Sequence, residues 1–143
     1  MMIKKRIFLI LLVVLAFVIG YILKSSITDP NLIIKDPDNA NIIEIIYVLN
    51  ADGESINIVD YNESVIVEYL STCYEKRIAS TMHNYQLGDY ILIVTLDDGE
   101  KIKQLLLGKG EGYSIVGYPS LLNKIVNEKE VLAEMLDILQ IKN

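Results

Sequence analysis

An unbroken apolar run near the N-terminus is the most prominent pattern in the chain. Residues 7–23 read IFLILLVVLAFVIGYIL and carry no charge; only Ala16, Gly20 and Tyr21 fall outside Leu, Ile, Val and Phe. As an α-helix this run measures about 26 Å, against a hydrocarbon core of roughly 30 Å. Tyr21 suits the interface and Lys24 can snorkel outward. The pattern predicts a transmembrane anchor at 7–23, preceded by a short N-terminus at 1–6.

A cleaved secretory signal is the main alternative for this run. Such signals also have a basic start, but their apolar region usually spans about 7–15 residues. The best small-residue site, Val18-Ile19-Gly20, falls inside the apolar run, and no cysteine follows closely enough for a lipoprotein signal. We therefore expect an uncleaved anchor, with a cleaved signal or a buried core helix as the alternatives.

The apolar periodicity stops after the run and resumes at residue 42. Residues 24–41 hold two of the three prolines, Pro30 and Pro37, among Ser, Asp and Asn. Each proline biases the preceding residue to an extended conformation. This composition predicts a linker at 24–41 that acts as a stalk, and one domain at 42–143.

Alternation of period two and helical spacing predict the elements of that domain. Glycine-containing turns separate the strands, and capping-box patterns precede both helices. The predicted strands are 42–49, 55–59, 90–96, 101–107, 113–117 and 121–126, although the last also fits a helical start. The predicted helices run from Asp60 with Glu63 to about Cys73, and from Asn127 with Glu130 to the C-terminus, with a polar loop at 74–88.

The order of these elements indicates the fold class. Helices do not alternate regularly with strands, which disfavours a parallel sheet. We expect an α+β protein: an N-terminal transmembrane helix followed by a small antiparallel β-sheet with two helices packed on one face.

The hairpin YILIVTLDDGEKIKQLLL and the closing helix NEKEVLAEMLDIL, about a third of the chain, carry a resemblance. The chain resembles small, uncharacterised membrane-anchored α+β proteins of Gram-positive bacteria, which join a basic N-terminus and apolar helix to a hairpin-rich domain of unknown function. Many of them carry a lipoprotein cysteine that is missing here. The resemblance implies a cell-envelope location and no particular activity.

Charge divides at the end of the apolar run. Residues 25–143 carry nine basic and 19 acidic side chains, a formal charge of −10. Binding to a phosphate backbone requires clustered Lys and Arg, so nucleic acid is excluded as a partner. Lys4, Lys5 and Arg6 outweigh Lys24 and Lys35, so the positive-inside rule predicts a cytoplasmic N-terminus and an extracytoplasmic C-terminal domain.

Catalytic and metal-binding patterns are weak. Nucleophilic catalysis needs a nucleophile and a base, and the chain has one cysteine, Cys73, and one histidine, His83. We expect Cys73 to be buried on the apolar face of a helix and His83 to lie in an exposed loop. The oxygen-rich segment at 36–41 departs from a calcium loop. No catalytic, cofactor-binding or metal-binding residue is assigned.

The remaining signals favour binding. Eight tyrosines lie outside the anchor, and Tyr85, Tyr90, Tyr113 and Tyr118 fall near the predicted ends of strands and loops. Packing in the core and at its rim is the better explanation for them, and recognition of a partner is the alternative. We predict a noncatalytic envelope module that binds a protein or cell-wall partner. The alternatives are an envelope hydrolase that uses Cys73 and His83, or a secreted inhibitor if the N-terminal segment is cleaved.

Overall fold

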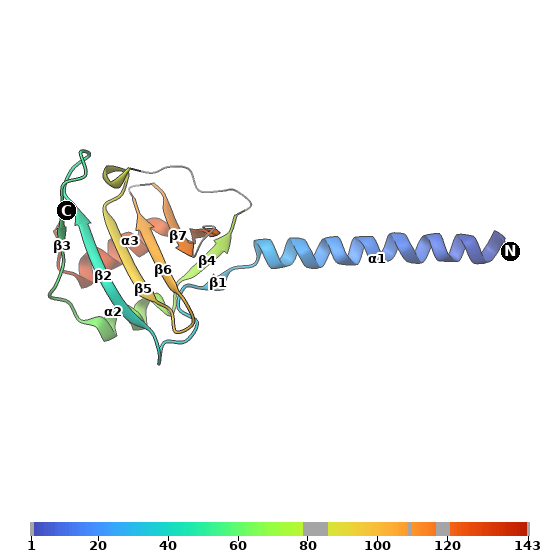
Figure 1. The fold of residues 1–143 in the computed structure, drawn as a ribbon, viewed down its shortest axis with the longest axis horizontal. Coiled ribbons are helices and arrows are strands. Elements are labelled where there is room, and N and C mark those ends of the chain that lie inside the picture. Colours follow the sequence, from blue (N-terminus) through green and yellow to red (C-terminus); the bar gives the residue numbers. More distant parts are fainter. Residues whose placement is uncertain (1, 79–85, 109, 117–120, 143) are drawn as a thin grey trace.

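One long helix and an antiparallel sheet define the architecture (Figure 1). The structure is a computed structural model that describes residues 2–78, 86–108, 110–116 and 121–142. Helix α1 (Met2–Thr28) extends away from the domain. Its stretch from Met2 to Leu23 is long and apolar enough to cross a membrane, and none of it is buried. The alternative of a buried core helix is therefore wrong for this structure.

Eight strands form one sheet in which every pair is antiparallel, as the sequence predicted. Its spatial order is β1-β4-β8-β7-β6-β5-β2-β3. The strands are β1 (Asn31–Leu32), β2 (Asn41–Val48), β3 (Ser55–Asn57), β4 (Tyr74–Arg77), β5 (Leu92–Asp97), β6 (Ile102–Leu107), β7 (Gly112–Val116) and β8 (Leu121–Ile125). The predicted segment 121–126, which also fitted a helical start, therefore forms a strand, β8.

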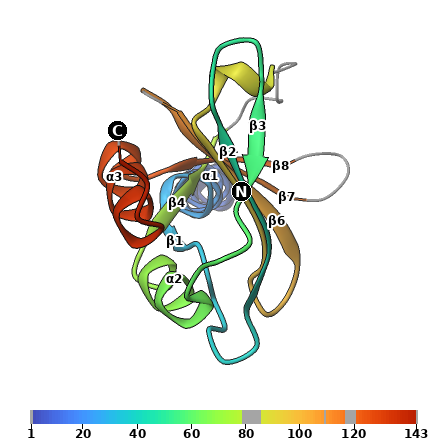
Figure 2. The same ribbon diagram turned by 90° about the vertical axis from the view of Figure 1, so that its left-hand side faces the viewer.

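Both domain helices cover one face of this sheet, as expected for the fold class (Figure 2). Helix α2 (Glu63–Leu70) carries the chain from β3 at one edge to β4 near the other, and α3 (Glu128–Ile138) follows β8. Their apolar sides join Val94, Leu105 and other strand residues in the main core. Burial of these aliphatic side chains stabilises the fold by about 1.5–3 kcal/mol each.

The opposite face of the sheet holds a smaller apolar cluster. Val48, Tyr90, Ile93 and Leu106 are buried there. The short helix η1 (Leu87–Asp89) contributes Leu87 to its margin. The sheet thus has apolar side chains on both faces, with the larger core under the helices.

The local signals at the helix ends were partly wrong. Asn62, not Asp60, caps α2, and its side-chain oxygen accepts a hydrogen bond from the Val65 N–H at 3.4 Å. The Glu63 carboxylate instead accepts the Ile42 N–H at 3.0 Å. Asn127 precedes α3 in the left-handed conformation and makes no side-chain cap.

The predicted loop at 74–88 is also corrected, because its first residues form β4 between β1 and β8. The alternation in this strand is hidden, since its inward residue is Glu75 and not an aliphatic side chain. Helix α2 ends at Leu70, three residues before the predicted end, and Cys73 follows it into the core.

The predicted stalk is wrong from Asn31 onward. Strand β1 pairs with β4, and the Ile33 N–H donates to the Cys73 carbonyl at 2.9 Å. Ile33 and Ile34 are 0% and 1% exposed, so the segment is part of the main core. Burial of Ile33 and Ile34, with partial burial of Leu32, removes apolar surface from water, and this gain in free energy outweighs the preference of the surrounding polar residues for solvent. Only Asp29 and Pro30 separate α1 from β1.

Candidate functional site

Cys73 is buried beneath α2. Its side chain belongs to the main core, and Sγ donates a hydrogen bond to the Tyr69 carbonyl at 3.4 Å. Burial raises the pKa of the thiol, and hydrogen bonds with Tyr69 and Thr72 offset this only in part. A nucleophilic cysteine needs a lowered pKa. The surroundings of Cys73 therefore oppose the role that the hydrolase alternative requires.

Of the other candidate residues, two lie in one apolar cluster. His83, Tyr85 and Tyr118 lie outside the described residues. Tyr90 is buried in the smaller apolar cluster. Tyr113 is half-buried on β7 and its hydroxyl donates to the Glu111 carboxylate at 3.1 Å. Tyr113 packs against the same cluster as Tyr90, so these two tyrosines serve packing on the face of the sheet away from α2 and α3.

The oxygen-rich segment at 36–41 forms a turn. Asn39 donates from its side-chain amide to the Asp36 carboxylate at 2.7 Å, and from its backbone to the Asp36 carbonyl at 3.2 Å. These bonds are those of a polar turn. Within the described part of the chain, no three His, Cys, Asp or Glu residues are grouped to hold a metal ion.

A buried charged cluster, which was not predicted from the sequence, joins the segment after β1 to the sheet. Lys103 on β6 is fully buried, and its Nζ donates to the Ile33 carbonyl at 2.6 Å. The same Nζ lies 3.0 Å from Glu75 Oε1 and 3.3 Å from Asp98 Oδ2. Lys103 therefore connects the residue after β1, strand β4 and the β5–β6 turn. We call Lys103, Glu75 and Asp98 the junction cluster.

The electrostatics of the junction cluster favour the ionised state of Asp98. Burial by itself raises the pKa of this carboxyl, but hydrogen bonds from the backbone N–H groups of Lys101 and Glu100 and the nearby charge of Lys103 outweigh it. The net pKa lies below its ordinary value. Asp98 Oδ1 accepts those two backbone bonds at 2.9 Å each, so the carboxylate also closes the turn.

The junction cluster can hold the chain together but cannot meet a ligand. The Lys103 and Asp98 side chains are 0% exposed and that of Glu75 is 6% exposed. The alternation of period two that places Leu105 and Leu107 inward also places Lys103 inward. That spacing was the signal for this lysine. Asp98 lies in the same hairpin, whereas Glu75 and Ile33 come from distant segments and have no sequence signal.

An open groove offers a solvent-accessible alternative. It lies between α2 and the loop that precedes β2 and has a volume of about 570 Å³. Such a volume falls within the range of known ligand sites, roughly 300–1,000 Å³. We call it the α2 groove, and it is lined by Pro37, Ala40, Glu63, Ser64, Val67, Glu68 and Ser71.

A hydrogen bond joins the two walls of the α2 groove. The Glu63 carboxylate accepts the Ile42 N–H at 3.0 Å, which fixes the start of β2 against the first turn of α2. Helical spacing brings Ser64, Val67, Glu68 and Ser71 to one side of α2. The loop that faces them is distant in sequence, so the sequence pattern alone gave no reason to bring the two together.

Comparison with models of protein families, with curated proteins and with solved structures finds no match to this chain, so the site is interpreted from its own geometry.

Proposed function

We propose that this chain is a membrane-anchored extracytoplasmic binding module, noncatalytic, which meets a protein partner at the membrane surface. The observation that carries the proposal is the junction between anchor and domain. Helix α1 is exposed and apolar, and the chain enters the core within a few residues of its end. A domain joined in this way has little freedom to leave the membrane surface.

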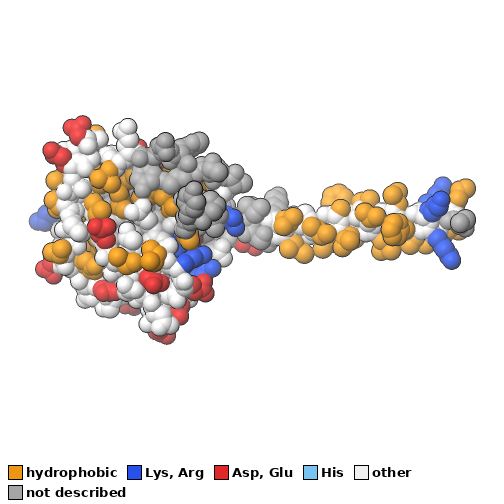
Figure 3. All heavy atoms as spheres, in the orientation of Figure 1, with side chains coloured by type: hydrophobic (Ala, Val, Ile, Leu, Met, Phe, Trp, Pro, Cys, Tyr) orange, Lys and Arg blue, Asp and Glu red, His pale blue; other side chains and the backbone are white. Residues whose placement is uncertain are grey.

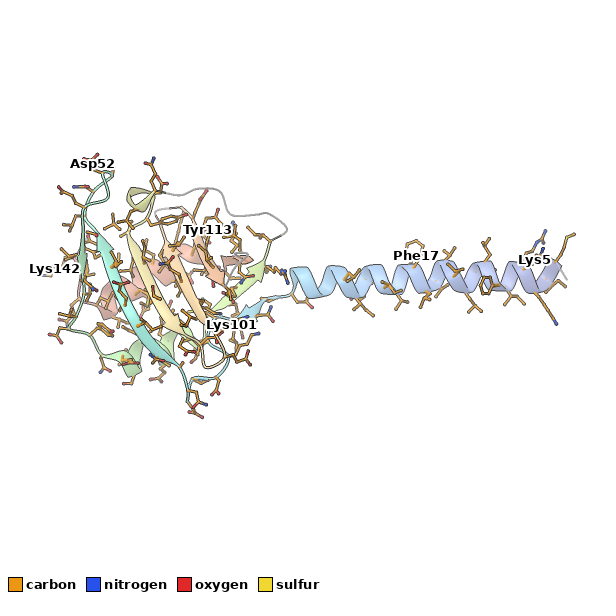
Figure 4. All side chains as sticks on the ribbon, in the orientation of Figure 1. Lys5, Phe17, Asp52, Lys101, Tyr113 and Lys142 are labelled. Atoms are coloured by element: carbon orange, nitrogen blue, oxygen red, sulfur yellow. The ribbon has the colours of Figure 1, made fainter. Side chains whose placement is uncertain are left out.

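Dimensions support this reading. The 27 residues of α1 make a helix of about 40 Å, which matches a bilayer of about 40–45 Å including its headgroups. Asp29 and Pro30 then span at most about 10 Å before β1 begins. Lys5 lies near the free end of α1, and the side chain of Phe17 points outward from the helix (Figure 4).

The orientation follows from charge. Lys4, Lys5 and Arg6 precede the apolar run and favour a cytoplasmic N-terminus by the positive-inside rule. The domain that follows is acidic, so anionic headgroups do not attract it. The anchor alone holds it at the surface. A partner within the membrane or beside it is thus favoured over a distant cell-wall component.

Two experiments test the proposal. A phosphatase that is active only outside the cytoplasm, fused after Asn143, is expected to be active, whereas activity of a strictly cytoplasmic reporter at the same position would reverse the orientation. Cross-linking in intact cells, followed by purification of the full chain, is expected to return a specific membrane-proximal protein. The matched control carries α1 before an unrelated domain. Identical products from both chains would contradict a binding role for this domain.

A further inference from the structure

We propose that the α2 groove binds a basic segment of a partner protein, seating a lysine or arginine side chain. This inference rests on the proposed function and names the surface and the chemistry of its partner. The binding event is noncovalent.

The lining of the α2 groove combines an apolar floor with an acidic rim. Pro37, Ala40 and Val67 supply aliphatic surface, while Glu63 and Glu68 stand exposed on the helix beside it. A long basic side chain has the complementary form, because its methylene stem packs on apolar surface while its charged head stays at the rim. Carboxylates form charge-assisted hydrogen bonds with such a head.

The charge at the groove is not compensated by nearby cations. Neither Glu63 nor Glu68 forms an ion pair with a basic residue in the described part of the chain. Asp36 and Asp38 flank Pro37, and Lys35 is the one basic residue in that loop. Figure 3 shows acidic side chains along the lower edge of the domain, where α2 and this loop lie in Figure 1. A cationic ligand is therefore attracted and a phosphate or an acidic peptide is repelled.

A metal ion is a poorer match than an organic cation. Calcium takes six to eight oxygen ligands, usually with several carboxylates converging on one point. One carboxylate oxygen of Glu63 already accepts the Ile42 N–H. The residues the structure describes contain no three-member group suited to a metal. The open groove instead suits a segment of polypeptide.

The groove opens at the side of the domain, and Figure 1 places α2 toward the end of the domain that is remote from α1. Viewed along the anchor in Figure 2, α2 and the loop before β2 lie at the periphery of the domain and not on the axis of α1. A protein can therefore approach the groove from the side of the domain without displacing any element of the fold.

The test uses the full chain in nanodiscs of neutral phosphatidylcholine, so that basic peptides do not bind to the lipid. The probe is a fluorescent Gly-Lys-Val-Lys-Gly peptide, followed by polarisation at low salt. We expect saturable binding in the micromolar range that weakens with salt. A double variant, Glu63→Gln with Glu68→Gln, is expected to weaken binding about tenfold. Glutamine at position 63 keeps an acceptor for the Ile42 N–H.

Matched controls distinguish an effect of total charge from an effect of position within the groove. Asp52→Asn with Asp137→Asn removes the same charge from exposed sites outside the groove and is expected to leave binding within about twofold. Ser64→Trp fills the groove without a change of charge and is expected to abolish binding. A peptide with Nε-acetyl-lysines, which keeps most of the stem but not the charge, is expected to bind at least tenfold more weakly.

Each remaining outcome overturns the inference. Equal weakening by both charge-removing pairs would show attraction to net charge alone, and unchanged binding by Ser64→Trp would place the peptide elsewhere. Strong competition by calcium would make the groove a metal site. A specific cross-linked partner in cells, together with no peptide binding, would refute the groove and leave the proposed function standing; loss of both would refute both.

Discussion

Replacement of Lys103 by methionine removes the cation on which three segments converge. Methionine fills a similar length of buried space without a charge or a donor. The variant leaves Glu75 and Asp98 buried without their shared cation, and the Ile33 carbonyl loses its 2.6 Å hydrogen bond. We expect this single change to destabilise the domain more than any substitution on its exposed surface.

The magnitude follows from what is left unpaired. Removal of one partner from a buried ion pair costs about 3–5 kcal/mol, and an orphaned buried carbonyl costs about 1–3 kcal/mol. The two costs are not additive, because both arise from the loss of one ammonium group. We expect a loss of about 3–5 kcal/mol, a large part of the stability of about 5–15 kcal/mol that is usual for a single domain.

The assay is urea unfolding of the full chain in detergent micelles, followed by the near-ultraviolet circular dichroism of tyrosine. With a urea slope of about 1–3 kcal/mol per molar, the midpoint is expected to fall by about 1 M or more. Lys101→Met is the control, since Lys101 is exposed in the same hairpin (Figure 4), and it is expected to cost less than about 0.5 kcal/mol. Equal midpoints for the two variants would refute the role assigned to the junction cluster.

Three further predictions concern the same core. Gly99→Ala is expected to destabilise the domain by at least about 1 kcal/mol, because φ is +95° and a Cβ would lie 2.6 Å from the Asp36 Cβ; Gly110→Ala, which meets nothing within 4 Å, is its control in the same urea titration. The pKa of Asp98 is lowered in the folded chain, so the stability that its charge contributes is present above about pH 4 and is lost as pH falls through the lowered value. Asp98→Asn is therefore expected to differ most from wild type, in its free energy of unfolding, near neutral pH. A constant difference down to pH 2 would contradict this. Burial raises the pKa of Cys73, so its reaction with iodoacetamide at pH 8 is expected to be at least tenfold slower in the folded chain than in urea, and equal rates by mass spectrometry would count against the buried position.

The parts of the fold that were predictable are those with local patterns. Period-two alternation and the Asp98-Gly99 pair identified the β5–β6 hairpin, and helical spacing identified α2 and α3. Each signal arises within a few residues of the element it forms. The long apolar helix was likewise predictable from the composition of residues 7–23, without any tertiary contact.

The parts that failed depend on contacts between distant segments. β1 has only two residues and gains its place by pairing with β4 and by burial of Ile33 and Ile34. The inward residue of β4 is Glu75, and a charged residue at an inward position made the segment look like a polar loop. Its pairing with Lys103 explains why it is buried. Glu75 and Lys103 in the junction cluster, and likewise the two walls of the α2 groove, come from distant parts of the sequence. Local sequence patterns describe one segment at a time and do not predict which distant segments come into contact.

We propose that the exposed apolar helix α1 remains attached to the domain and lies in the membrane. Fractionation of gently lysed cells, followed by intact-mass and peptide mapping of the chain, tests it most directly. We expect chains that retain residues 7–23 only in the membrane fraction, released by detergent and not by high salt or alkaline carbonate. Chains with that segment in the aqueous fraction, or shortened chains that begin after it, would contradict the account.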